Sequence, residues 1–153
     1  MSRTEKSPKL PPRWVVRIAW NVHRAIYTVT GGRRGLWPAE PRKWGAMRVT
    51  TIGRRTGRER SVILGYFEDG PNLVTMAMNG WGEGEPAWWL NLLANPEATV
   101  VLADGERAVS AAAAKGAERE RLWARWRALD HGLEGYAKMR STETAVVVLS
   151  PRA

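Results

Sequence analysis

Strand-like segments that follow one another across tight turns constrain the fold more than any other feature of this 153-residue sequence. Asp69-Gly70-Pro71 and Asp104-Gly105 are turn signals, and the second is a strong signal for a two-residue hairpin. The first turn separates the strand-like segments 60–68 and 72–78, and the second separates 98–103 and 106–113. Strands joined by turns this short must pair antiparallel, because a parallel pair needs a long crossover connection.

Two further segments, 46–52 and 144–149, are rich in β-branched residues and also favour strands. Helices are expected over 13–29, 87–94 and 117–129, so strands and helices do not alternate as they do around a parallel sheet. The pattern predicts an α+β domain that is mainly β. About six antiparallel strands would form a barrel or a sandwich with flanking helices.

Basic residues are concentrated in the first part of the chain. Residues 1–60 contain 15 basic residues (lysine or arginine) and three acidic residues. Residues 61–153 contain nine basic and 12 acidic residues. This asymmetry predicts an anionic partner for the first third, and nucleic acid, anionic lipid and a phosphorylated cofactor all fit that charge. The sequence has no cysteine and only two histidines, so we expect neither a disulfide nor a metal site.

The N-terminal segment is divided in two by composition. Residues 1–12 contain three prolines and scattered charge, which predicts a disordered tail before a single domain over 13–153. In the helix expected over 13–29, Arg13 and Arg17 begin a narrow basic face on a mostly apolar helix. This helix either lies on an anionic membrane or packs on its own domain with the basic face in solvent. We expect a cytoplasmic protein, with peripheral membrane contact under the first alternative.

The segment 53–60 is the clearest candidate for a binding site. It lies between two expected strands and places four arginines around two glycines: Gly53-Arg54-Arg55-Thr56-Gly57-Arg58-Glu59-Arg60. Glycines let backbone N–H groups point at an anion, and arginine adds bidentate contacts to phosphate or carboxylate oxygens. No Gly-Lys-Ser/Thr follows, so this is not a Walker loop. On spacing alone, the segment is either an anion-binding loop or a solvated basic hairpin loop.

A glycine-rich loop that leads into an apolar helix is the second candidate. Asn79-Gly80 opens the loop, and Pro86 suits the first turn of the helix that follows. One of Trp88 and Trp89 is expected in the core, and the other is available to stack on a planar ring. Asn91 is a polar side chain in an apolar helix, and it therefore holds either a neighbouring loop or a ligand.

Tyr136 is the third candidate, in a stretch expected to be irregular between the last helix and the last strand. A phenol can donate a proton or a hydrogen bond to a developing anion. The alternative is a tyrosine packed at the edge of a loop, and His131 is subject to the same two interpretations. No serine has a plausible histidine and aspartate setting, so a hydrolase triad has no support.

Two long motifs in register resemble the deazaflavin-dependent nitroreductase family of actinobacteria. The first is Thr50-Thr51-Ile52-Gly53-Arg54-Arg55-Thr56-Gly57-Arg58-Glu59-Arg60. The second is Ala77-Met78-Asn79-Gly80 followed by Pro86-Ala87-Trp88-Trp89-Leu90-Asn91-Leu92-Leu93-Ala94-Asn95-Pro96. Their order and the lengths between them agree with the family pattern, and the resemblance runs from about residue 13 to residue 149.

The resemblance implies a split β-barrel and an oxidoreductase that takes a hydride from reduced coenzyme F-420, a deazaflavin with a phosphate and an oligoglutamate tail. Quinones, nitroaromatics and activated alkenes are the implied acceptors. The residues implied to bind the anionic part are Arg54, Arg55, Thr56, Gly57 and Arg60. Those implied to flank the deazaflavin are Ala77, Met78, Asn79, Gly80, Trp88 and Asn91, and those on the acceptor side are Trp81, Leu133 and Tyr136.

The chain departs from the family pattern mainly on the acceptor side. Met78 stands where the family often has serine, and Trp81 where it often has glycine. Leu133 replaces a second tyrosine, which removes a hydrogen-bond donor that nitroreductase activity would use. We therefore expect the cofactor side to follow the family more closely than the acceptor side.

Two other functions remain open at this stage. One is an oxidoreductase of the same fold that binds flavin mononucleotide (FMN). The other is a non-catalytic binder, either a deazaflavin carrier or a membrane-associated protein. Nucleic acid is not expected as a partner, because the sequence lacks a surface pattern in which basic and aromatic residues alternate.

Overall fold

A computed structural model describes residues 36–78 and 83–152 of the chain. The expected tail over 1–12 and the expected helix over 13–29 lie outside the described residues, and so do Asn79, Gly80 and Trp81. The domain boundary at residue 13 therefore stays a prediction. Within the described residues, no helix is long and apolar enough to cross a membrane.

Six antiparallel strands close into a barrel in the order β1-β2-β3-β6-β5-β4, and β1 pairs with β4 to complete the ring. The strands are β1 (Gly45–Ile52), β2 (Glu59–Asp69), β3 (Asn72–Met76), β4 (Glu97–Leu102), β5 (Gly105–Ala113) and β6 (Val146–Pro151). Short connections join β1 to β2, β2 to β3 and β4 to β5, as expected. The mainly β fold with antiparallel strands is confirmed, and the arrangement is a barrel.

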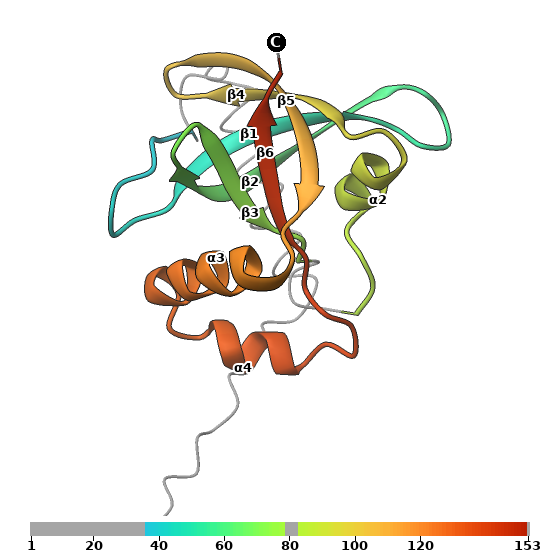
Figure 1. Ribbon diagram of the computed structural model, residues 1–153. Coiled ribbons are helices and arrows are strands. Elements are labelled where there is room, and N and C mark those ends of the chain that lie inside the picture. Colours follow the sequence, from blue (N-terminus) through green and yellow to red (C-terminus); the bar gives the residue numbers. More distant parts are fainter. Residues whose placement is uncertain (1–35, 79–82, 153) are drawn as a thin grey trace, which may run out of the picture.

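Three helices flank the barrel: α2 (Ala87–Ala94), α3 (Gly116–Leu129) and α4 (Leu133–Lys138). Figure 1 shows α2 at one side of the barrel, with α3 and α4 together below one end of it. Helix α2 packs against β1 and β2, and α3 packs against β6 and α4. The bounds expected for α2 are confirmed, and α3 begins one residue earlier than expected.

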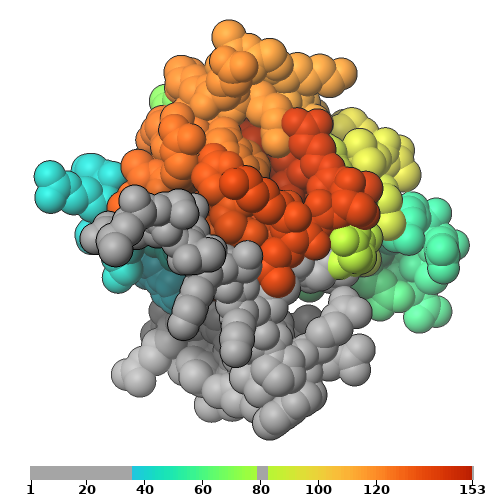
Figure 2. Space-filling view, turned by 90° about the horizontal axis from the view of Figure 1, so that it is seen from below, coloured from blue at the N-terminus to red at the C-terminus, as the bar shows by residue number. Residues whose placement is uncertain are grey.

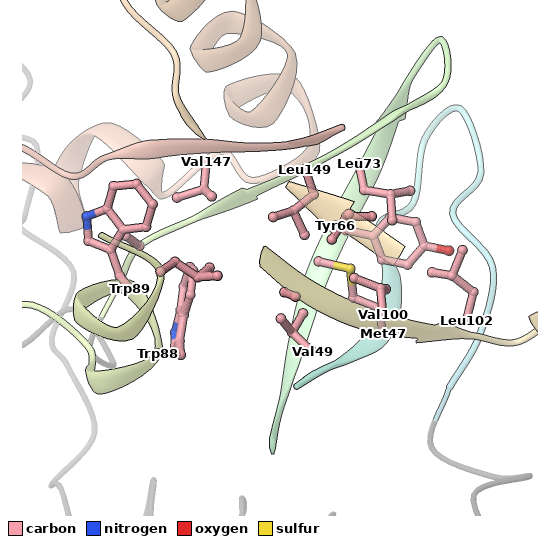
Figure 3. Close-up of a cluster of buried hydrophobic side chains, with 14 residues drawn as sticks. Met47, Val49, Tyr66, Leu73, Trp88, Trp89, Val100, Leu102, Val147 and Leu149 are labelled. Carbon is pink, nitrogen blue, oxygen red and sulfur yellow. The ribbon is translucent and has the colours of Figure 1, made fainter. Parts of the chain in front are cut away.

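The barrel interior is filled by side chains from all six strands and by both tryptophans of α2 (Figure 3). A second cluster lies outside the barrel, where α3 and α4 cover β3 and β6 through Leu122, Trp126 and Leu133. Strand β6 is buried on both faces: Val147 and Leu149 belong to the interior, and its other apolar side chains belong to the second cluster. This burial explains why β6 is an unbroken apolar run in the sequence.

Some local expectations were wrong. Tyr136 lies in a short helix, α4, and not in an irregular stretch, because six residues are too few to show a helical period. The turn between β4 and β5 falls at Ala103-Asp104, one residue before the expected position. The apolar sequence of α2 also predicts a helix buried on nearly every side, but Leu93 is 60% exposed. The last strand begins at Val146, two residues later than expected.

Candidate functional site

A cavity of about 620 Å³ lies between the arginine loop (53–60), β2, β3 and α2. Its walls come from residues 53–56 of the loop, residues 60–65 of β2, the end of β3 and the start of α2. Loop and helix are far apart in the sequence but form adjacent walls of one space. The structure thus brings together the two motifs that the sequence singled out.

Glycines shape the arginine loop. The N–H of Gly53 donates to the carbonyl of Arg58 at 2.8 Å, and the N–H of Gly57 donates back to the carbonyl of Gly53 at 2.8 Å. Gly57 has φ of +70°, a conformation that costs other residues free energy. A Cβ on Gly53 would lie 3.0 Å from Oγ1 of Thr56, which itself accepts from the N–H of Arg58 at 3.2 Å. The loop is therefore compact, and its two glycines cannot easily be replaced.

Asn91 ties helix α2 to the arginine loop. Its Oδ1 accepts from the backbone N–H of Arg54 at 3.2 Å and from Nη1 of Arg54 at 3.1 Å. Its Nδ2 donates to Oγ1 of Thr51, at the end of β1, at 3.2 Å. Asn91 is only 4% exposed, and these contacts partner both polar atoms of its amide. Of the two roles expected for Asn91, the structure shows that of holding a neighbouring loop.

The arginine loop carries uncompensated positive charge. Arg54, Arg55, Arg58 and Arg60 are all exposed, and within residues 36–78 and 83–152 none of them forms an ion pair with a carboxylate. Three of them, Arg54, Arg55 and Arg60, line the cavity, and Arg58 does not. Exposed guanidinium groups without carboxylate partners can bind phosphate or carboxylate oxygens of a ligand. This end of the cavity is therefore suited to an anion.

The other walls of the cavity are largely apolar. Val62, Leu64, Met76 and Met78 contribute from the barrel side, and Trp88 contributes from α2. Trp89 does not line the cavity and packs inside the barrel (Figure 3). Trp88 lines the cavity but is buried in the same core cluster, so both tryptophans belong to the core and stacking of Trp88 on a planar ring stays a prediction. Apolar walls next to a basic end fit a ligand that combines a ring system with an anionic group.

Seven of the residues expected to bind the cofactor line the cavity: Arg54, Arg55, Thr56, Arg60, Met78, Trp88 and Asn91. Gly57 and Ala77 do not. Gly57 shapes the loop, and Ala77 is buried, with its N–H donating to the carbonyl of Ala145 at 2.9 Å. The binding role of all these residues stays a prediction.

Of the residues expected on the acceptor side, Leu133 and Tyr136 do not line this cavity, and Trp81 lies outside the described residues. Leu133 is fully buried in the second core cluster, which accounts for an apolar residue at this position. Tyr136 is partly buried against the same cluster, with its ring 2.7 Å from where a Cβ on Gly132 would lie. Met76 and Met78 belong to that cluster and also reach the cavity. The acceptor-side roles of Leu133 and Tyr136 therefore stay predictions.

Sequence reasoning missed two groups of residues around the cavity. Residues 61–65 of β2, with Thr75 and Met76 of β3, form its floor, and their position directly after the arginine loop was the available signal. Arg140 and Glu83, in the second group, hold the segment that leads into α2. The hydroxyl and N–H of Ser141 both donate to the Glu83 carboxylate, and these hydrogen bonds lower the pKa of Glu83 below its usual range. No local pattern marked this second group.

Comparisons with known proteins agree with the geometry. The family model for F420H(2)-dependent quinone reductases matches residues 20–151. An F420H(2)-dependent quinone reductase from Mycobacterium tuberculosis strain H37Rv is 34% identical over 80 residues, which cover 52% of each chain. The chain therefore spans about half the length of the curated relatives it matches.

Two solved structures support the same fold. The structure of an F420-H2 dependent reductase gives a TM-score of 0.63 at 24% identity, over 69% of this chain and 93% of that one. A heme storage protein from Vibrio cholerae gives a TM-score of 0.56 at 10% identity, over 82% of this chain and 89% of that one. These likenesses confirm the split β-barrel. Since the family model extends over most of the sequence, the chain belongs to the F420H(2)-dependent quinone reductase family.

Proposed function

We propose that this protein binds reduced coenzyme F-420 in the 620 Å³ cavity and reduces a quinone with it. The observation that carries the proposal is the arginine loop at one end of the cavity. Three arginines that pair with no carboxylate among the described residues line that end, and Asn91 fixes the loop to the helix that forms the next wall. The M. tuberculosis relative is named for the same cofactor and the same acceptor class.

The residues present fit the cofactor. Arg55 and Arg60 would bind its phosphate or carboxylate groups, and the compact loop around Gly53 leaves no bulky side chain in the way. Trp88 and the methionines at the end of β3 would hold the ring system and exclude water from it. When bound, reduced coenzyme F-420 supplies a hydride, which is the chemistry that the protein itself lacks.

Reduction of a quinone to a hydroquinone needs one hydride and one proton. The chain contributes by positioning the reactants, because orientation inside a cavity replaces a random encounter in solution. The proton would come from solvent or from Tyr136, whose acceptor-side role we retain as a proposal. No side chain that lines the described cavity is a carboxylic acid or a histidine.

Titration of the protein with coenzyme F-420, followed by fluorescence quenching, tests the proposal. Arg55→Ala and Arg60→Ala should each raise the dissociation constant about tenfold, as expected for a lost charge-assisted contact. Arg58→Ala is the matched control, because it removes the same charge from the same loop outside the cavity. If Arg55→Ala and Arg60→Ala both bind coenzyme F-420 as tightly as the wild-type protein does, the arginine loop does not bind the cofactor.

Turnover separates an enzyme from a carrier. Oxidation of the reduced cofactor should accelerate when a naphthoquinone is added together with the protein. Binding without acceleration would indicate a deazaflavin carrier. If FMN displaces coenzyme F-420 when it is present at only a tenth of the concentration of coenzyme F-420, the protein is instead a flavin enzyme.

We also propose that the protein works in the cytoplasm with peripheral contact to the membrane through residues 13–29. The support is the basic and apolar composition of that segment together with a lipid-soluble class of acceptor. Co-sedimentation with anionic liposomes should be lost when residues 1–29 are deleted. Equal sedimentation of both proteins would refute the contact.

A further inference from the structure

Arg140 is a fully buried arginine that contacts three separate segments of the chain. Its Nη1 donates to the carbonyl of Ala77 at 3.1 Å and to Oγ1 of Thr144 at 2.7 Å. Its Nη2 donates to the carbonyl of Gly84 at 2.8 Å and lies 3.5 Å from Oε1 of Glu85. The side chain has no exposed surface. One guanidinium group therefore joins the end of β3, the segment before α2 and the segment before β6.

A buried charge of this kind is costly, since removing an arginine from water is offset only by very good hydrogen-bond geometry. An apolar side chain would fill the same volume at lower cost. What arginine adds is a rigid planar fork, which can hold several carbonyl oxygens at fixed separations. Here the guanidinium donates to the backbone carbonyls of Ala77 and Gly84, and it thereby fixes the distance between the two segments that carry them.

The two carbonyls stand next to the walls of the cavity. Ala77 precedes Met78, and Gly84 lies two residues before Pro86, and both Met78 and Pro86 line the cavity. Arg140 itself does not line it. Figure 2 shows the segment after α4, in red, directly against the yellow-green segment that leads into α2. A second contact in the same place, from the Ser141 hydroxyl to Glu83 at 2.7 Å, is exposed to solvent.

We propose that Arg140 is a positioning residue, which sets the spacing between Met78 and Pro86 and thereby the fit of the cofactor's ring system. It acts through the backbone and does not touch the cofactor. The inference rests on the proposed function, because it assumes that coenzyme F-420 occupies this cavity. It adds a determinant of affinity that is distant in sequence from both cofactor motifs.

The test compares Arg140→Met and Arg140→Lys with Arg119→Met in the full chain. Arg119 is the matched control: it donates to the carbonyl of Thr144 at 2.8 Å and pairs with Glu143 at 2.7 Å, but contacts neither Ala77 nor Gly84. Arg140→Met should raise the dissociation constant for coenzyme F-420 about tenfold. Arg140→Lys should recover part of this loss, because an ammonium can hold one carbonyl but not both. Arg119→Met should lower the melting temperature without changing the affinity.

Amide hydrogen exchange of the ligand-free variants supplies a second readout. Residues 83–88 and Met78 should exchange faster in Arg140→Met but not in Arg119→Met. If Arg140→Met does not fold, Thr144→Val removes one acceptor of the same guanidinium and should give the same pattern more weakly.

Two outcomes would overturn the inference. One is that the Arg119 variant loses as much affinity for coenzyme F-420, for a given fall in melting temperature, as the Arg140 variants do. The other is unchanged exchange of residues 83–88 in every Arg140 variant. If the wild-type protein does not bind coenzyme F-420 at all, the proposed function fails, and the exchange data still decide whether Arg140 holds the two segments together.

Discussion

Replacing Asn91 by alanine should weaken cofactor binding although the helix and the arginines remain. The substitution removes both hydrogen bonds between the amide oxygen and Arg54, together with the bond to Thr51. Thr51 keeps a longer contact from its hydroxyl to the carbonyl of Arg60 at 3.4 Å. The main consequence is therefore that the start of the arginine loop loses its attachment to α2.

The size of the effect follows from these contacts. A neutral hydrogen bond contributes about 1 kcal/mol and one to a charged group about 1.5 kcal/mol, so the two neutral bonds and the one charged bond are together worth about 3.5 kcal/mol. For a chain of this length, at about 2–4 °C per kcal/mol, such a loss lowers the melting temperature by about 7–14 °C. The two bonds to Arg54 order the loop, and losing them should raise the dissociation constant for coenzyme F-420 about tenfold.

Calorimetric titration and a thermal melt of the same sample measure both effects. Asn95→Ala is the matched control, because Asn95 is the C-cap residue of α2 and its side chain accepts from the N–H of Glu97 and from no other group among the described residues. It should leave the affinity unchanged. Asn91 acts partly through Arg54. The loss of binding free energy in the Asn91→Ala/Arg54→Ala double variant should therefore be smaller than the sum of the losses in the two single variants.

An unchanged dissociation constant in Asn91→Ala, with a melting temperature that falls as expected, would refute the reasoning. It would show that the loop is ordered without its attachment to α2. Fully additive effects of Asn91→Ala and Arg54→Ala would contradict it as well, since they would assign independent roles to the two side chains.

Three further predictions concern single positions. Gly57→Ala should cost about 1–2 kcal/mol, because φ is +70° there while no atom lies within 4 Å of an added Cβ, and an unchanged melting temperature would argue against this loop conformation. The depressed pKa of Glu83 means that its contact with Ser141 contributes fully above the ordinary value of 4.5 and is lost as the pH falls through the lower value in the folded protein. The melting temperatures of wild type and Glu83→Gln should therefore differ at neutral pH and converge in acid, and a constant difference would contradict the assignment. Leu133→Tyr should destabilise the fold by about 1–3 kcal/mol through overpacking, and more than Leu133→Phe, whereas faster quinone reduction with an unchanged melting temperature would place this side chain at the acceptor site.

The antiparallel strands could be predicted from the sequence because their signals are local, whereas the choice of a barrel over a sandwich came from the family resemblance. Turns such as Asp69-Gly70-Pro71 lie between clear strand patterns, and Pro86 marks the start of α2. The arginine loop was visible for the same reason, since its glycines and arginines are contiguous. The partner of Asn91 was not visible, because Arg54 is 37 residues away and only the packing of α2 against β1 and β2 brings them together.

The contacts of α4 and of the segment after it were beyond sequence reasoning. Helix α4 has six residues and includes a glycine, so neither periodicity nor propensity identifies it. Arg140 resembles any surface arginine in a polar stretch. Its burial follows from the docking of three distant segments, and a single sequence carries no trace of that arrangement.

Strand β6 belongs to two cores, and this has a consequence for how the protein unfolds. Its inner side chains pack inside the barrel, its outer ones pack beneath α3 and α4, and its backbone pairs with β3 and β5. Detaching the helical layer would expose half of β6 to water, and removing β6 would open the ring of strands. We therefore expect the barrel and the helical layer to unfold together in one cooperative transition.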